Sequence, residues 1–79
     1  MVKLKQIEKN GDQITCIAFV EDCKEPIEII FHIPDGSIQN SPLPVGYEWC
    51  RSHICHAQSA LEKMAKEGEF PENWNIMWY

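Results

Sequence analysis

The sequence predicts an α+β fold: a three- to four-stranded, largely antiparallel β-meander with one helix packed on one face and a C-terminal strand. The N-terminal part of the chain alternates apolar and polar residues with a period of two, which is typical of strands. From Tyr47 the apolar residues recur every three or four positions, which is typical of a helix. The predicted order is β-β-β-(β)-α-β, within a single small domain covering residues 1–79.

The first two strands are predicted to form a hairpin. They flank Asn10-Gly11, a dipeptide that accepts the positive φ angles of a type I′ turn. A turn centred on this dipeptide places Leu4 opposite Ile17 and so fixes which side chains share a face. The two strands cover residues 2–8 and 13–21.

A third strand is predicted over residues 26–33, after a bend at 21–25. In the register that we expect, Ile17 of the second strand faces Ile29 of the third. Another turn signal, IPDGS at 33–37, follows with proline and glycine at positions that suit a tight turn. Residues 37–39 either form a short fourth strand or belong to the loop.

The helix is predicted over about residues 47–67. Its apolar stripe consists of Tyr47, Cys50, Ile54, Ala57, Leu61 and Met64. Gly68 is suited to the left-handed conformation that commonly ends a helix. Residues 74–79, WNIMWY, alternate again and are predicted to form the C-terminal strand.

The two predicted registers assign each strand residue to one of two sheet faces. The face expected under the helix carries Val2, Leu4, Ile17, Phe19, Ile29 and Phe31. The uncovered face is expected to carry Ile7, Ile14, Cys16, Ala18, Ile30 and His32, interrupted by Lys3, Lys5 and Glu28. Depending on its register, the C-terminal strand adds Met77 and Tyr79, or Trp74, Ile76 and Trp78, to the uncovered face.

This apolar uncovered face is the main functional indication in the sequence. A single-layer sheet normally shows polar residues to water, and a contiguous apolar patch commonly marks an interface. We therefore expect a protein–protein interaction module that acts by occupying a partner surface, and a homodimer is one form of it. His32 would make the association sensitive to pH. The alternative is that the loop over residues 34–46 or the terminal segments fold over the face.

Composition bears on the kind of partner. The formal net charge is −5, and a surface with this charge repels phosphate backbones, so direct nucleic-acid binding is disfavoured. Carboxylates could instead steer the protein to a basic groove, as in an inhibitor of a nucleic-acid-binding protein. The acidic residues expected to take part are Glu21, Asp22, Glu25 and Glu28.

The segment WCRSHICH (49–56) raises an alternative function, a zinc- or thiol-dependent protein. On a regular helix its four candidate ligands point in different directions, and a structural zinc site needs four convergent ligands. These candidates are Cys50 in the apolar stripe, His53 at its edge, and Cys55 and His56 facing outward. Further ligands would have to come from Cys16, Cys23 or His32, of which only Cys23 is placed to reach the helix. We therefore expect no metal site.

Neither catalysis nor a cofactor is expected. Cys50 is predicted to be buried, whereas a reactive thiolate needs an electropositive and partly open setting. The sequence contains no glycine-rich phosphate loop. The charged N-terminal residues do not resemble a signal peptide, and the longest apolar run, ITCIAFV, is too short to cross a bilayer. We accordingly expect a cytoplasmic protein with free thiols.

Overall fold

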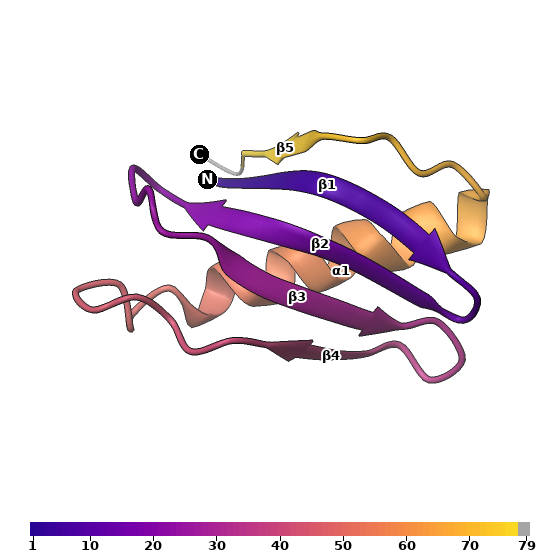
Figure 1. Cartoon of the computed structure of the whole chain (residues 1–79), viewed down its shortest axis with the longest axis horizontal. Helices are drawn as coiled ribbons and strands as arrows, with labels where there is room; N and C mark the ends of the chain where they lie inside the picture. Colours follow the sequence, from indigo (N-terminus) through magenta and orange to yellow (C-terminus); the bar gives the residue numbers. More distant parts are fainter. Residues whose placement is uncertain (78–79) are drawn as a thin grey trace.

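The computed structural model describes residues 1–77 and forms a five-stranded antiparallel sheet with one helix on one face (Figure 1). The elements are β1 (Val2–Asn10), β2 (Gln13–Val20), β3 (Ile27–His32), β4 (Ser37–Asn40), α1 (Arg51–Glu67) and β5 (Trp74–Ile76). The strand order is β4-β3-β2-β1-β5, so four strands form a meander and β5 returns to pair with β1. The α+β class and the order β-β-β-β-α-β are confirmed.

The predicted register of β2 is wrong, and β2 is turned over relative to the prediction. Leu4 pairs with Ala18, and Cys16 pairs with Ile29. Since paired residues of antiparallel strands share a face, the helix covers the side of β2 that was expected to be open. The residues that move to the covered side are Ile14, Cys16 and Ala18, and those that move to the open side are Ile17 and Phe19.

The cause is a β-bulge in β1. Asn10 pairs with Gln13, so the two central turn residues are Gly11 and Asp12, one position later than predicted. Moving the turn by one position shifts the pairing by two residues, which leaves the two faces of β2 unchanged. The register then shifts by one residue between Lys5 and Glu8, at a β-bulge where Gln6 has a φ of 55°, and this shift exchanges the faces. Within the bulge Ile7 is buried, so its expected place on the uncovered face is also wrong.

The hydrophobic core lies between α1 and the covered face of the sheet. Its central strand, β2, supplies the small side chains Cys16 and Ala18, whereas β1 and β3 supply larger ones. The largest fully buried side chains include Leu4, Ile14, Ile27, Ile29, Phe31 and Leu61.

The helix is shorter than predicted, but its buried stripe is the predicted one. Its first residue is Arg51, and Cys50 occupies the N-cap position, so the segment from Tyr47 to Cys50 forms turns. Gly68 ends the helix with a φ of 72°, as predicted, and its N–H donates to the carbonyl of Met64 at 2.8 Å. The buried helix residues are His53, Ile54, Ala57, Leu61 and Met64. Within residues 1–77, no helix has the length and apolar character needed to cross a membrane.

Candidate interaction surfaces

The sheet face opposite α1 is uncovered in the part of the chain that the structure describes. Figure 1 views this face, and no described segment passes in front of the strands. The segment over residues 34–46, predicted as a loop, does not fold across it: Ser37–Asn40 form β4 beside β3, and Leu43 packs against the core. We call this surface the open face; it carries Lys3, Lys5, Thr15, Ile17, Phe19, Glu28, Ile30 and His32.

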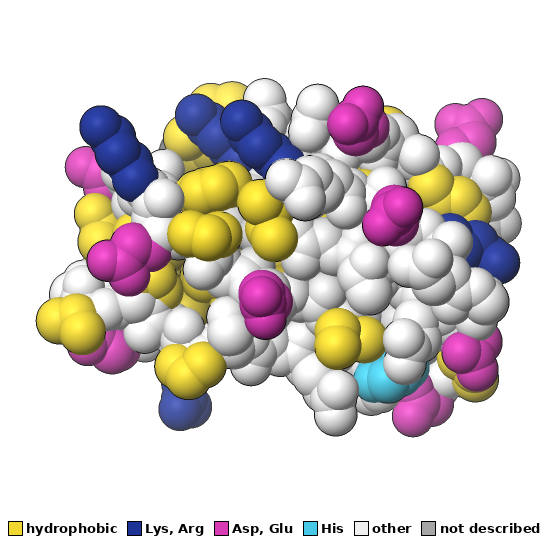
Figure 2. Space-filling view, viewed as in Figure 1, with side chains coloured by type: hydrophobic (Ala, Val, Ile, Leu, Met, Phe, Trp, Pro, Cys, Tyr) yellow, Lys and Arg dark blue, Asp and Glu magenta, His cyan; other side chains and the backbone are white. Residues whose placement is uncertain are grey.

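The centre of the open face is apolar and its two sides carry opposite charges. Ile17, Phe19 and Ile30 are partly exposed there. Figure 2 shows hydrophobic side chains grouped between basic side chains on the β1 side and an acidic side chain on the β3 side. The Lys5 ammonium lies 5.9 Å from the centroid of the Phe19 ring, so this lysine is held over the sheet.

The predicted interaction residues are divided among three locations. Ile30, His32 and Glu28 do lie on the open face, and their contact with a partner stays a prediction. Ile7, Ile14 and Cys16 are core residues. Met77 is 67% exposed just after β5, and Tyr79 lies outside the described residues.

Two of the four predicted acidic interaction residues are bound within the chain. Glu21 accepts contacts at one carboxylate oxygen, Oε1, from the N-terminal ammonium at 3.3 Å and from His53 Nε2 at 3.0 Å. Asp22 accepts a 2.7 Å hydrogen bond from the Tyr47 hydroxyl, and this bond raises the pKa of Tyr47 to about 12. Glu25 is exposed in the turn before β3. The turn therefore anchors the N-terminal end of α1 to the sheet.

His53 is buried beside this turn, although its position suggested the edge of the apolar stripe. The edge of its ring contacts the Trp49 ring, with centroids 5.6 Å apart. Its partner Glu21 is 32 positions away in sequence. The position of His53 one helical turn beyond Cys50 could have indicated that its side chain is buried. Its carboxylate partner, Glu21, could be identified only from the fold.

The thiols of the helix cluster do not converge. Burial raises the pKa of Cys50, as does the nearby negative charge of Glu21, and burial raises the pKa of Cys16 to about 12. A thiol that stays protonated is a poor nucleophile and a poor metal ligand. Cys55 is exposed on the outer side of α1. Residues 1–77 contain no group of three or more His, Cys, Asp or Glu side chains that could hold a metal ion.

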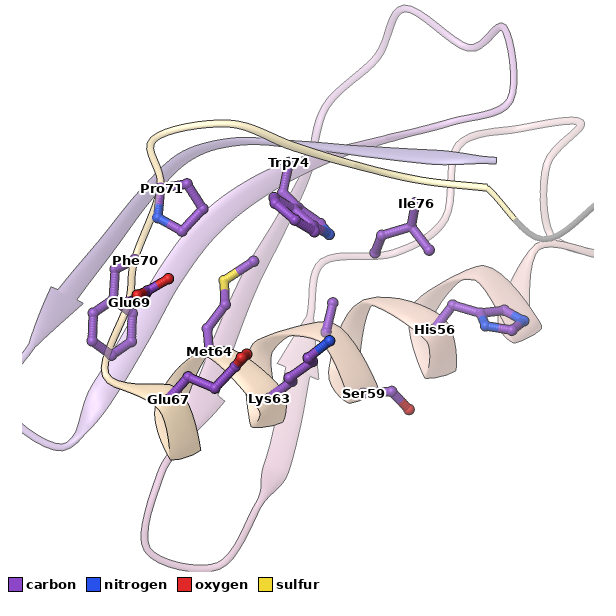
Figure 3. A pocket seen from close by; sticks show the side chains of 11 residues that line it. His56, Ser59, Lys63, Met64, Glu67, Glu69, Phe70, Pro71, Trp74 and Ile76 are labelled. Carbon is purple, nitrogen blue, oxygen red and sulfur yellow. The ribbon is translucent and has the colours of Figure 1, made fainter.

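A groove between α1 and β5 is a surface that the sequence did not reveal. It has a volume of about 750 Å³, and in Figure 3 Trp74 and Ile76 of β5 lie opposite the side chain of Met64 on α1. Trp74 is 49% exposed there. The groove is lined by His56, Ser59, Ala60, Lys63, Met64, Glu67, Glu69, Phe70, Pro71, Trp74 and Ile76.

The groove forms because the chain turns back after α1. The left-handed conformation of Gly68 reverses the direction, and the N–H of Ile7 donates to the carbonyl of Glu72 at 3.0 Å, which holds the returning segment against β1. β5 then pairs with Val2, Lys3 and Leu4 at the end of the sheet. Its other edge is unpaired within the described residues, directly beside the groove.

Among residues 1–77, the open face and the α1–β5 groove both bring several apolar groups together at the surface. Function has to be inferred from these two surfaces, because comparisons with protein-family models, with curated proteins and with solved structures found no match.

Proposed function

We propose that this protein is a protein-interaction module that takes up an extended, basic segment of a partner along β5 and the α1–β5 groove. The observation that carries the proposal is the groove itself, an apolar hollow of about 750 Å³ beside the free edge of β5. Concave apolar surfaces with a few polar groups at the rim are the usual form of a binding site.

The floor of the groove supplies the binding energy in this proposal. Met64 of α1, Trp74 and Ile76 of β5, and Phe70 of the segment between these elements line a common space (Figure 3). Aromatic and methionine side chains are enriched in protein interfaces. Trp74 is 49% exposed, so covering the rest of it recovers about half of the 1.5–3 kcal/mol typical of burying a whole large apolar side chain.

The free edge of β5 supports an extended conformation of the partner segment. An unpaired edge strand offers backbone N–H and C=O groups to an added strand. On α1 the groove extends from His56 to Glu67, which is about 16 Å at 1.5 Å per residue. This length matches about five residues of extended chain. Alternate side chains of such a strand would point into the groove.

The charge of the surroundings favours a basic occupant. The groove has one lysine, Lys63, against two glutamates, Glu67 and Glu69, and the whole chain has a net charge of −5. Attraction between opposite charges speeds association and selects partners. Basic segments are common in nucleic-acid-binding proteins, so inhibition of such a protein is one role that this site would serve.

The test is an NMR titration of the ¹⁵N-labelled protein with a short synthetic peptide of alternating lysine and valine. We expect shifts concentrated in residues 56–76, and weaker shifts with the corresponding glutamate–valine peptide. Trp74→Ala should weaken binding about tenfold or more, as for a buried interface tryptophan. Trp49→Ala is the matched control, since Trp49 is 63% exposed and lies outside the groove.

Three results contradict the proposal. The first is no shift with millimolar lysine–valine peptide. The second is a shift pattern confined to the open face. The third is equal loss of binding in the Trp74→Ala and Trp49→Ala variants. Tighter binding of the glutamate–valine peptide would reverse the predicted charge preference and with it the basic partner.

A further inference from the structure

We propose that the open face of the sheet is the interface with a second copy of this chain. In this dimer the two sheets pack face to face about a twofold axis that runs parallel to β2, and Lys5 of each copy lies against Glu28 of the other. This inference concerns a different surface from the α1–β5 groove and goes beyond the proposed peptide binding.

The centre of the proposed interface is the apolar stripe of β2. Ile17 and Phe19 lie along it, and Ile30 of β3 lies beside it. All three are partly exposed, and no described element covers them. A second copy of the same stripe supplies an apolar surface of matching length, since face-to-face sheets with nearly aligned strands are a standard packing.

The charges on the two sides of the stripe are arranged in one row. Lys5 of β1 pairs with Ile17 of β2, and Ile17 pairs with Glu28 of β3, so these three residues lie side by side across the sheet. The basic residue is on one side of the stripe and the acidic residue on the other. Both charged side chains are exposed.

This arrangement selects the direction of the symmetry axis. A twofold axis parallel to β2 and passing over it places β1 of one copy over β3 of the other and keeps each row in register. Lys5 then lies over Glu28 twice, once in each direction, as an isologous interface requires. An axis perpendicular to the strands would place β1 over β1 and bring the lysines of the two copies together.

The dimensions are compatible with such a dimer. Packed sheets lie about 10 Å apart, a gap that a lysine and a glutamate side chain together can span. The molecule measures 33 by 22 Å in the plane viewed in Figure 1, which bounds a face of about 700 Å². Stable interfaces bury about 600–1,000 Å² on each partner, so a dimer would lie at the lower end of this range and would use the whole open face.

Lys5 also contacts the apolar stripe of its own copy. Its ammonium lies over the Phe19 ring at 5.9 Å from the centroid, while the side chain as a whole is exposed. The charge that is to meet Glu28 of the second copy therefore lies beside the stripe.

The experiment is analytical ultracentrifugation of the full chain without peptide, combined with charge exchange. We expect the wild type to dimerise. Lys5→Glu and Glu28→Lys should each raise the dimer dissociation constant at least about tenfold, because each variant places like charges together twice. The double variant Lys5→Glu, Glu28→Lys should restore dimerisation. An equimolar mixture of the two single variants should form a heterodimer.

Lys24→Glu is the matched control, since Lys24 is exposed in the turn before β3 and is not part of a strand of the open face. A wild type that stays monomeric at millimolar concentration overturns the dimer. Dimerisation that survives both single exchanges, or that neither the double variant nor the mixture restores, overturns the proposed pairing. None of these results depends on the groove, so failure of the dimer and failure of the peptide site can be told apart.

Discussion

The two faces of β2 differ in how continuously they are apolar. The covered face carries four buried apolar side chains, Ile14, Cys16, Ala18 and Val20. The open face carries Gln13, Thr15, Ile17 and Phe19, all partly exposed. The helix thus covers the face of β2 that is apolar along its whole length, although the largest side chain of the strand, Phe19, lies on the other face. On a central strand, an unbroken apolar face can receive the helix even when the opposite face carries a larger side chain.

The strongest test of this comparison places a charge on each face of β2. Ile14 is fully buried, and Ile17 is partly exposed on the open face. Ile14→Glu buries an unpaired carboxylate, which costs several kcal/mol and is comparable to the whole stability of a small domain. We expect Ile14→Glu to be unfolded by circular dichroism. Ile17→Glu should stay folded and lose about 1 kcal/mol in urea unfolding.

The register predicted from the sequence places Ile14 on the uncovered face, where an acidic residue would be tolerated. In the structure Ile14 lies on the covered face, so the expected effect of Ile14→Glu is reversed. If Ile14→Glu folds and Ile17→Glu does not, the assignment of the two faces is wrong. Both variants should be measured at low micromolar concentration, so that dimerisation does not contribute to the measured stability.

The next largest loss of stability is expected from a substitution on α1, which lines the other side of the same core. Leu61 is fully buried. Leu61→Ala removes apolar contacts and leaves a cavity, so it should cost about 2–5 kcal/mol. Ser59→Ala is a suitable control on the same helix, since Ser59 is exposed, and it should change the unfolding free energy by no more than about 0.5 kcal/mol. Equal urea midpoints for the two variants would contradict the predicted packing of the stripe.

The sequence predicted the elements well because periodicity is a local property. The helical spacing of Ile54 and Leu61 and the stop at Gly68 depend only on neighbouring residues, and all three are found as predicted. The faces of β2 depend instead on a one-residue shift of the pairing between Lys5 and Glu8, because moving the turn centre by one position leaves the faces unchanged. The bulge at Gln6 had no recognisable sequence signal.

The candidate sites were harder to predict because they join distant segments. The groove needs the segment after Gly68 to return along β1, and the contact of Glu21 with His53 joins residues 32 positions apart. The open face was predicted as a feature, and Ile30 and His32 were assigned to it correctly. Its apolar centre was assigned to the wrong residues because one slip in register moves a whole strand.

A smaller loss of stability is expected at alkaline pH, because the buried Cys16 thiol of the covered face stays protonated in the folded protein. Burial raises the pKa of Cys16 from 9.0 to about 12. In the unfolded chain this thiol loses its proton at lower pH than in the folded protein. Its contribution to stability is therefore complete below about pH 9 and is lost as the pH rises toward 12. The decrease should approach about 1.4 kcal/mol per pH unit.

Urea unfolding at several pH values between 8 and 11 measures this loss. Cys50 also has a raised pKa, so the Cys16→Ala variant should still lose stability with pH, but with a slope smaller by about one proton. Cys55→Ala is the control, because Cys55 is exposed, and it should leave the slope unchanged. A Cys16→Ala slope equal to that of the wild type would mean that this thiol is not protected by the core.

The smallest effect concerns Lys5, whose role on the open face differs between the monomer and the proposed dimer. In the monomer its ammonium interacts with the Phe19 ring, 5.9 Å from the centroid, and such contacts contribute about 0.5–1 kcal/mol at exposed sites. Lys5→Gln should therefore lower the unfolding free energy by at most about 1 kcal/mol at a concentration where the chain is monomeric. In a Phe19→Leu background, Lys5→Gln should lower the unfolding free energy by less, because the aromatic ring is absent.

If the loss of unfolding free energy is the same in both backgrounds, the lysine stabilises the monomer by some other contact. If the loss grows with protein concentration, the additional part belongs to the interface, since only association makes stability depend on concentration.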